Sequence, residues 1–166
     1  MRKILPLLSL AILSACAEEP SPEEQAVEAA TRNALVEKGN ATLPPLELVE
    51  PQPIQYPDIE RHDLFGAGCN FAPGTSVGTR VIARPVDAYM KIDGEMVRFA
   101  ADSGARELPL GTRSRYLGRA HELQLELSGE GTQSGSETVD YQGIVTLRDE
   151  HGRIVYRASG LAQCGS

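Results

Sequence analysis

Tryptophan is absent from this sequence, and three phenylalanines and five tyrosines make up only 5 % of its 166 residues. Basic residues are also scarce: 16 Lys and Arg face 23 Asp and Glu, which gives a net charge of −7. That deficit argues against a nucleic-acid-binding protein, because such proteins displace counterions with clustered Lys and Arg. Glycine and proline are plentiful, at 16 and 11 residues, which is typical of a turn-rich β domain rather than a helical bundle.

Only one apolar run is long enough to suggest a membrane segment, and it lies at the N-terminus. Arg2 and Lys3 precede an apolar stretch over residues 4–13. A helix of this length is too short for a hydrocarbon core about 30 Å thick. A basic start, a short apolar run and small residues after it are typical of a cleaved signal peptide, here residues 1–15.

The end of this signal peptide carries a more specific motif. The residues Leu13-Ser14-Ala15-Cys16 resemble a bacterial lipobox, the cleavage site of the lipoprotein signal peptidase. The resemblance implies that Cys16 becomes the first mature residue and carries acyl chains that anchor the protein to a membrane. Ala17 stands where an inner-membrane retention signal has Asp, which favours the outer membrane, facing the periplasm. The alternative is an ordinary secretory signal with an incidental cysteine.

Two cysteines remain besides Cys16, which is the number that one disulfide needs. Removal of residues 1–15 takes away two basic groups, so the mature chain has a net charge of −9. In the oxidising cell envelope, Cys69 and Cys164 are expected to form a disulfide that joins the end of the chain to the start of the domain. The alternative is a pair of free thiols.

A helix and a proline-rich segment are expected to tether the domain over residues 16–58. Ser21, Pro22 and Glu24 form a capping box and a helix start, and the helix is expected to run over 22–38 and stop at Gly39. Its apolar stripe is mostly alanine, which favours a solvated spacer; a partner-binding helix is the alternative.

The proline-rich part of this tether covers residues 43–57. Five prolines in these fifteen residues favour an extended, semi-rigid chain. Alternating apolar residues leave a second possibility, in which the segment packs onto the domain as an edge strand. Those residues are Leu46, Leu48, Ile54 and Tyr56.

Residues 59–166 have the alternation of an antiparallel β domain. Residues 121–128 alternate without interruption and place three leucines on one face. Further strands are expected at residues 77–83, 88–92, 96–99, 139–148 and 153–158. With about seven strands, the fold class is mainly β, a small antiparallel β-barrel or sandwich.

Two short connections have the chemistry of tight turns, and two longer ones do not. Asp93-Gly94 predicts a two-residue hairpin, and residues 149–152 predict a type I turn closed by a left-handed glycine. Residues 128–137 are polar and glycine-rich, which predicts a flexible hairpin loop. Residues 101–116 are expected to form an irregular connection.

The sequence offers little catalytic chemistry. The three histidines are His62, His121 and His151, and none has the spacing of a zinc site. Ser103 has no base in view, and the glycine-rich residues 129–135 lack the lysine of a phosphate-binding loop. No catalytic residue, metal or cofactor is therefore predicted.

One basic cluster stands out from the acidic background. It consists of Arg106, Arg113, Arg115 and Arg119, together with Tyr116. Arginine and tyrosine are common in the centres of binding surfaces, and guanidinium groups suit the anionic groups of glycans and lipid headgroups. We interpret the cluster as a recognition surface; the alternative is a charged loop that balances nearby acids.

The predicted architecture resembles one known family. A small β domain on a lipobox anchor, bridged by cysteines at its start and end, is similar to the membrane-bound inhibitors of c-type lysozyme. Those inhibitors carry a Ser-Gly-x-x-Tyr segment that plugs the lysozyme cleft. Here Ser103-Gly104 is followed by Ala105, Arg106 and Glu107, so the tyrosine is missing and the inhibitory function is not implied.

These features predict a lipid-anchored protein of the bacterial cell envelope. Its β domain is expected to act as a non-enzymatic binding or accessory module for an envelope protein, glycan or lipid, in addition to the membrane that holds its anchor. A small envelope hydrolase, whose residues converge from separate loops, is the alternative. A purely structural spacer is a third possibility.

Overall fold

A computed structural model describes residues 21–39 and 43–166 of the chain. The predicted signal peptide, the lipobox and the acylated Cys16 lie outside the described residues. The chain divides into two units at Pro44, of which the first contains a helix and the second a β-barrel. Among the described residues, no helix has the length and apolar character needed to cross a membrane.

The helix of the first unit, α1 (Pro22–Gly39), has the predicted start. The backbone N–H of Ser21 donates to the Glu24 carboxylate at 2.8 Å, and the N–H of Glu24 donates to the Ser21 hydroxyl at 3.3 Å. This reciprocal pair satisfies two backbone donors that no helical carbonyl can reach. The capping residues therefore fix where the helix begins.

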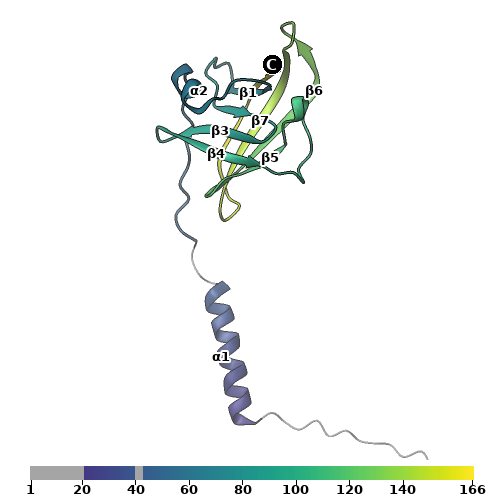
Figure 1. Ribbon diagram of the computed structural model, residues 1–166. Helices are drawn as coiled ribbons and strands as arrows, with labels where there is room; N and C mark the ends of the chain where they lie inside the picture. Colours follow the sequence, from purple (N-terminus) through teal and green to yellow (C-terminus); the bar gives the residue numbers. More distant parts are fainter. Residues whose placement is uncertain (1–20, 40–42) are drawn as a thin grey trace, which may run out of the picture. The chain divides into compact units, whose positions relative to one another are not determined.

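The second unit is a closed antiparallel barrel in which each strand pairs with the next one along the chain (Figure 1). The pairing of β1 with β8 closes the barrel. The strands are β1 (Gly68–Pro73), β2 (Val81–Ala83), β3 (Asp87–Ile92), β4 (Glu95–Ala101), β5 (Arg115–Leu117), β6 (His121–Gln133), β7 (Val139–Asp149) and β8 (Ile154–Gly165). The mainly β prediction is confirmed, with a barrel rather than a sandwich and eight strands rather than about seven.

Both predicted tight turns are present. Asp93 and Gly94 have φ values of 50° and 82° and join β3 to β4, as the two positions of this hairpin turn require. Gly152 has φ 77° in the turn from β7 to β8. The Asp149 carboxylate locks that second turn by accepting hydrogen bonds from the backbone N–H groups of His151 and Arg153.

The glycine-rich residues after Ser128 differ from the predicted loop. Strand β6 continues to Gln133, and its register with β7 shifts between Ser128 and Thr132. Gly129 and Gly131 both have positive φ and accommodate this bulge. Only residues 134–138 form the turn, whose tip extends toward the C-terminus in Figure 1.

The barrel interior is filled by side chains. Alternation along each strand directs one set of residues inward, and the inward residues of all eight strands meet in one apolar cluster. Its largest fully buried members are Tyr116, Phe71, Phe99, Met90, Leu123, Leu125, Leu147, Val81 and Val145.

A second apolar cluster lies on the outside of the barrel wall. It consists of Ile54, Leu64, Ile82 and Tyr89, with Ile59 and Met96 packed against it. The outward side chains of β2 and β3 here meet two segments that precede the barrel. These are residues 45–55, which we call the strap, and α2 (Tyr56–His62).

The strap was expected to be part of an extended tether, with packing onto the domain as the alternative, and the structure shows the packing. The N–H groups of Val49, Gln52 and Ile54 donate to the carbonyls of Val155, Lys91 and Thr79 at 2.8–2.9 Å. The prolines of the strap do not prevent this, because the donors are the residues between them. Burial of Ile54, at 6 % exposure, supplies an apolar driving force.

Candidate functional site

The predicted arginine cluster lies on residues 102–119, which we call the arginine segment. After β4, the backbones of Glu107 and Arg113 form an isolated antiparallel β-bridge. Next to it, the N–H of Ser114 donates to the carbonyl of Arg106 at 2.9 Å. A short 3-10 turn, η1 (Pro109–Gly111), forms the tip of this small hairpin. The N–H of Leu125 donates to the carbonyl of Ser114 at 3.0 Å and so ties the hairpin to β6.

Two of the four arginines are neutralised by carboxylates. The Arg115 guanidinium binds the Asp102 carboxylate. The Arg113 guanidinium lies 3.3 Å from the Glu107 carboxylate. A hydrogen bond from the Gly104 N–H, together with Arg115, lowers the pKa of Asp102, and the same pairing raises the pKa of Arg115. These two side chains therefore hold the segment together.

Arg106 and Arg119 remain exposed, and within residues 43–166 neither has a carboxylate in ion-pair range. Arg106 and Arg115 line a shallow groove of about 350 Å³ between the small hairpin and the outer face of β6. Glu126 also lines this groove, so its charge is mixed. The structure thus separates the cluster into two paired and two free cations.

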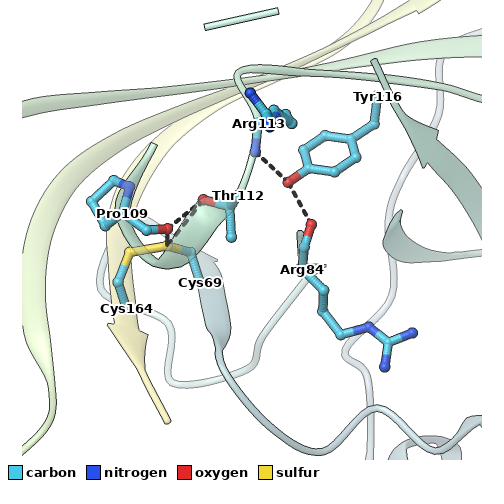
Figure 2. Close-up of a disulfide and its surroundings, with 7 residues drawn as sticks. All are labelled: Cys69, Arg84, Pro109, Thr112, Arg113, Tyr116 and Cys164. Carbon is cyan, nitrogen blue, oxygen red and sulfur yellow. Dashed lines mark hydrogen bonds between the residues drawn. A yellow bond between two sulfur atoms is a disulfide. The ribbon is translucent and has the colours of Figure 1, made fainter. Parts of the chain in front are cut away.

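Tyr116 is in the barrel core and is not exposed beside the arginines. Its hydroxyl accepts a hydrogen bond from the Arg113 N–H at 2.7 Å and donates one to the Arg84 carbonyl at 3.0 Å (Figure 2). Burial raises the pKa of this phenol. The prediction of Tyr116 as a ligand-contacting residue is therefore wrong, because its side chain is covered on all sides.

The disulfide between Cys69 and Cys164 is present, with an S–S distance of 2.04 Å. The two cysteines lie directly opposite each other where β1 pairs with β8. The sulfur of Cys69 lies 3.7 Å from the hydroxyl of Thr112, which is fully buried and donates to the Pro109 carbonyl (Figure 2). The disulfide thus cross-links the two strands that close the barrel and contacts the tip of the arginine segment.

The three histidines have separate surroundings. The ring of His62 lies 6.0 Å from that of Tyr89, and His151 lies 3.7 Å from Glu150 in the exposed turn after β7. His121 begins β6 opposite Asp149. Within the described parts of the chain, no group of three or more His, Cys, Asp or Glu is arranged to hold a metal ion. Ser103 is exposed in the tight turn from Asp102 to Gly104.

A second groove was not predicted from the sequence. It has a volume of about 600 Å³ and lies between strap residues 48–51 and β8, with apolar residues over most of its lining. Two basic residues, Arg80 and Arg157, also line it. The alternation of apolar residues in the strap indicated that this segment could pack on the barrel. That alternation did not indicate that Arg80 and Arg157 would lie beside the strap, because they come from distant parts of the chain.

No family model matches the chain, and neither does any curated protein or solved structure. The fold and the two surfaces described above therefore stand on this chain's own residues.

Proposed function

We propose that the protein is a non-enzymatic binding module of the bacterial cell envelope. In this proposal, lipid on Cys16 holds it at the outer membrane, facing the periplasm, and the β-barrel is presented to an envelope protein. The anchor rests on the lipobox resemblance of residues 13–16. The binding role rests on the barrel.

The observation that carries the binding role is the filled interior. Barrels that hold a small ligand keep space between their walls, whereas this barrel has large, fully buried side chains from β1, β3, β4, β5, β6 and β7. A ligand of this barrel is therefore bound on the outside.

The arginine segment supplies a surface of suitable composition. Arg106 and Arg119 are exposed cations, and Leu110 and Leu117 are exposed at 43 % and 48 %. Leu110 also has φ 58°, a backbone conformation that few side chains adopt. Sparsely populated conformations are retained where the surrounding structure enforces them, often at binding sites.

The test is chemical crosslinking in intact cells with the full-length, tagged chain. We expect one abundant crosslinked protein, reduced about tenfold by the double substitution Arg106→Ser/Arg119→Ser, because hot-spot arginines carry much of the binding free energy. Arg61→Ser changes an exposed arginine of α2 and is the matched control. The variant Cys16→Ser should lose both the acylated N-terminal peptide, detected by mass spectrometry, and the membrane-bound crosslink.

Two results would contradict the proposal. An unmodified Cys16 in the mature wild-type protein would exclude the lipid anchor. A crosslinked partner that Arg61→Ser and the double variant reduce equally would show that the arginine segment has no specific role.

A further inference from the structure

The wall of the barrel has a gap on one side of β8. Strand β1 pairs with β8 only as far as Pro73 opposite Gly160, and β8 continues to Ile154. Beyond this point two single hydrogen bonds cover its edge: the Gly74 N–H donates to the Ser159 carbonyl, and the Val49 N–H donates to the Val155 carbonyl.

Arg157 lies between these two covered positions. Backbone groups of alternate residues in a strand point to the same edge, so the N–H and C=O of Arg157 point to the edge used by Val155 and Ser159. No strand of the barrel pairs with β8 there. One residue of β8 thus presents a free backbone donor and acceptor, which is a template for another strand.

This free edge opens into the groove of about 600 Å³ beside the strap. Val155 on its floor is buried, and Tyr156 and Ala158 are half-buried against the barrel core. Val49 packs against the same core from the strap side. The groove therefore offers apolar contacts on both sides of the exposed backbone.

The charges in this groove are not balanced. Arg80 donates to the Gly78 carbonyl at 2.7 Å, but within the described residues neither it nor Arg157 has a carboxylate in ion-pair range. Two unpaired guanidinium groups in one groove of an acidic protein favour an anionic ligand. Glu50 is the acidic residue of the lining.

We propose that this groove binds an extended peptide segment of a partner protein, which adds a strand residue at Arg157 and places an acidic side chain between Arg80 and Arg157. Apolar side chains next to that acid would contact Tyr156 and Val49. This is a one-residue form of β-strand addition: the peptide pairs with β8 only at Arg157, between the positions that Val49 and Gly74 already cover, and the flanking side chains supply the rest of the affinity and the specificity.

The exposed backbone favours a peptide over a lipid in this groove. An acyl chain with an anionic headgroup would satisfy the two arginines and the apolar floor. However, it would cover the N–H and C=O of Arg157 without pairing them, and burial of an unpaired amide is costly. A peptide pairs both groups.

This inference rests on the proposed function, because it assigns a ligand class to one surface of the binding module. The experiment is selection of a displayed library of random decapeptides on the immobilised full-length chain, followed by binding titrations with the best labelled peptide. We expect selected peptides to share an acidic residue beside an apolar one. Replacement of that acid by its amide should weaken binding about tenfold, as should Arg80→Gln/Arg157→Gln. Arg61→Gln is the control and should bind as the wild type does.

A second readout is specific to strand addition. The bound peptide should slow hydrogen exchange of the Arg157 amide, whereas laurate, used as an anionic acyl probe, should not. The inference is overturned if no peptide is selected, if selected peptides bind the double variant as tightly, or if laurate binds and peptides do not. None of these outcomes changes the crosslinking result for Arg106 and Arg119, so the two proposals can fail separately.

Discussion

At the scale of single residues, the best-defined polar group on the barrel's outer wall is the carboxylate of Asp58. It is almost completely buried on α2, where it accepts hydrogen bonds from the Gln55 N–H at 2.9 Å and from the Lys91 ammonium at 2.9 and 3.0 Å. The hydrogen bond from the Gln55 N–H, followed by that from Lys91, lowers the pKa of Asp58 from its ordinary value. One side chain thus caps the helix and joins it to β3.

This arrangement predicts a pH-dependent contribution to stability. Because the pKa of Asp58 is lower in the folded than in the unfolded chain, its contribution is complete above the unfolded value and is lost as the pH falls through the folded value. We expect Asp58→Asn to reduce the free energy of unfolding by about 2 kcal/mol at pH 7. Urea denaturation should show this difference narrowing below about pH 4.

Lys91→Met is the companion variant for this measurement. It removes the cation and leaves the hydrogen bond from the Gln55 N–H. The difference in the free energy of unfolding between this variant and the wild type should therefore also narrow in acid. The assigned pKa direction would be contradicted if the free energies of unfolding of Asp58→Asn and the wild type differed by a constant amount from pH 7 to pH 3.

At the scale of elements, the strap shows how a proline-rich segment becomes part of a β domain. Proline removes a backbone donor, but Gln52 lies between Pro51 and Pro53 and donates to Lys91 of β3. The side chain that anchors the strap is Ile54, at 6 % exposure, whereas Leu48 in the same segment is 74 % exposed. Apolar residues of the strap are therefore not equivalent.

Substitution of these two residues tests the assignment of the strap to the barrel unit. Ile54→Ala should lower the free energy of unfolding by about 3 kcal/mol, because it leaves a cavity among Leu64, Ile82 and Tyr89. Leu48→Ala is the matched control and should change it by less than about 0.5 kcal/mol. Equal effects in chemical denaturation would mean that the strap is not held on the barrel.

At the scale of the whole molecule, closure of the barrel joins the two ends of one domain. Every other strand pair is made between neighbours in sequence, but β1 must meet β8. Cys69 and Cys164 are 95 residues apart and form their disulfide within this pair. With the disulfide formed, the longest loop of the barrel is already closed in the unfolded chain, so folding does not have to supply the entropy of closing it.

Loss of the disulfide should thus have a large effect. In the chain-entropy model, Cys69→Ala/Cys164→Ala should lower the free energy of unfolding by about 4–5 kcal/mol. Alanine is chosen because both positions are buried. Wild-type protein treated with a reductant should shift its denaturation midpoint by a similar amount, and an unchanged midpoint after verified reduction would contradict this role.

Local patterns in the sequence were sufficient for the capped helix, the two tight turns, the mainly β class and the disulfide pairing. Each depends on interactions between residues a few positions apart, or on the simple pairing of two cysteines. The lipobox and Cys16 are also local, and they stay a prediction because they lie outside the described residues.

Tertiary structure decided the features that depend on distant residues. Tyr116 has charged neighbours in sequence, yet it turns into the core, because the three residues of β5 are too few for alternation to show which face is buried. The ion pairs of Arg113 and Arg115 depend on where the arginine segment folds back. The groove at Arg157 exists only because β1 ends at Pro73 while β8 continues, a difference in strand length that no local pattern encodes.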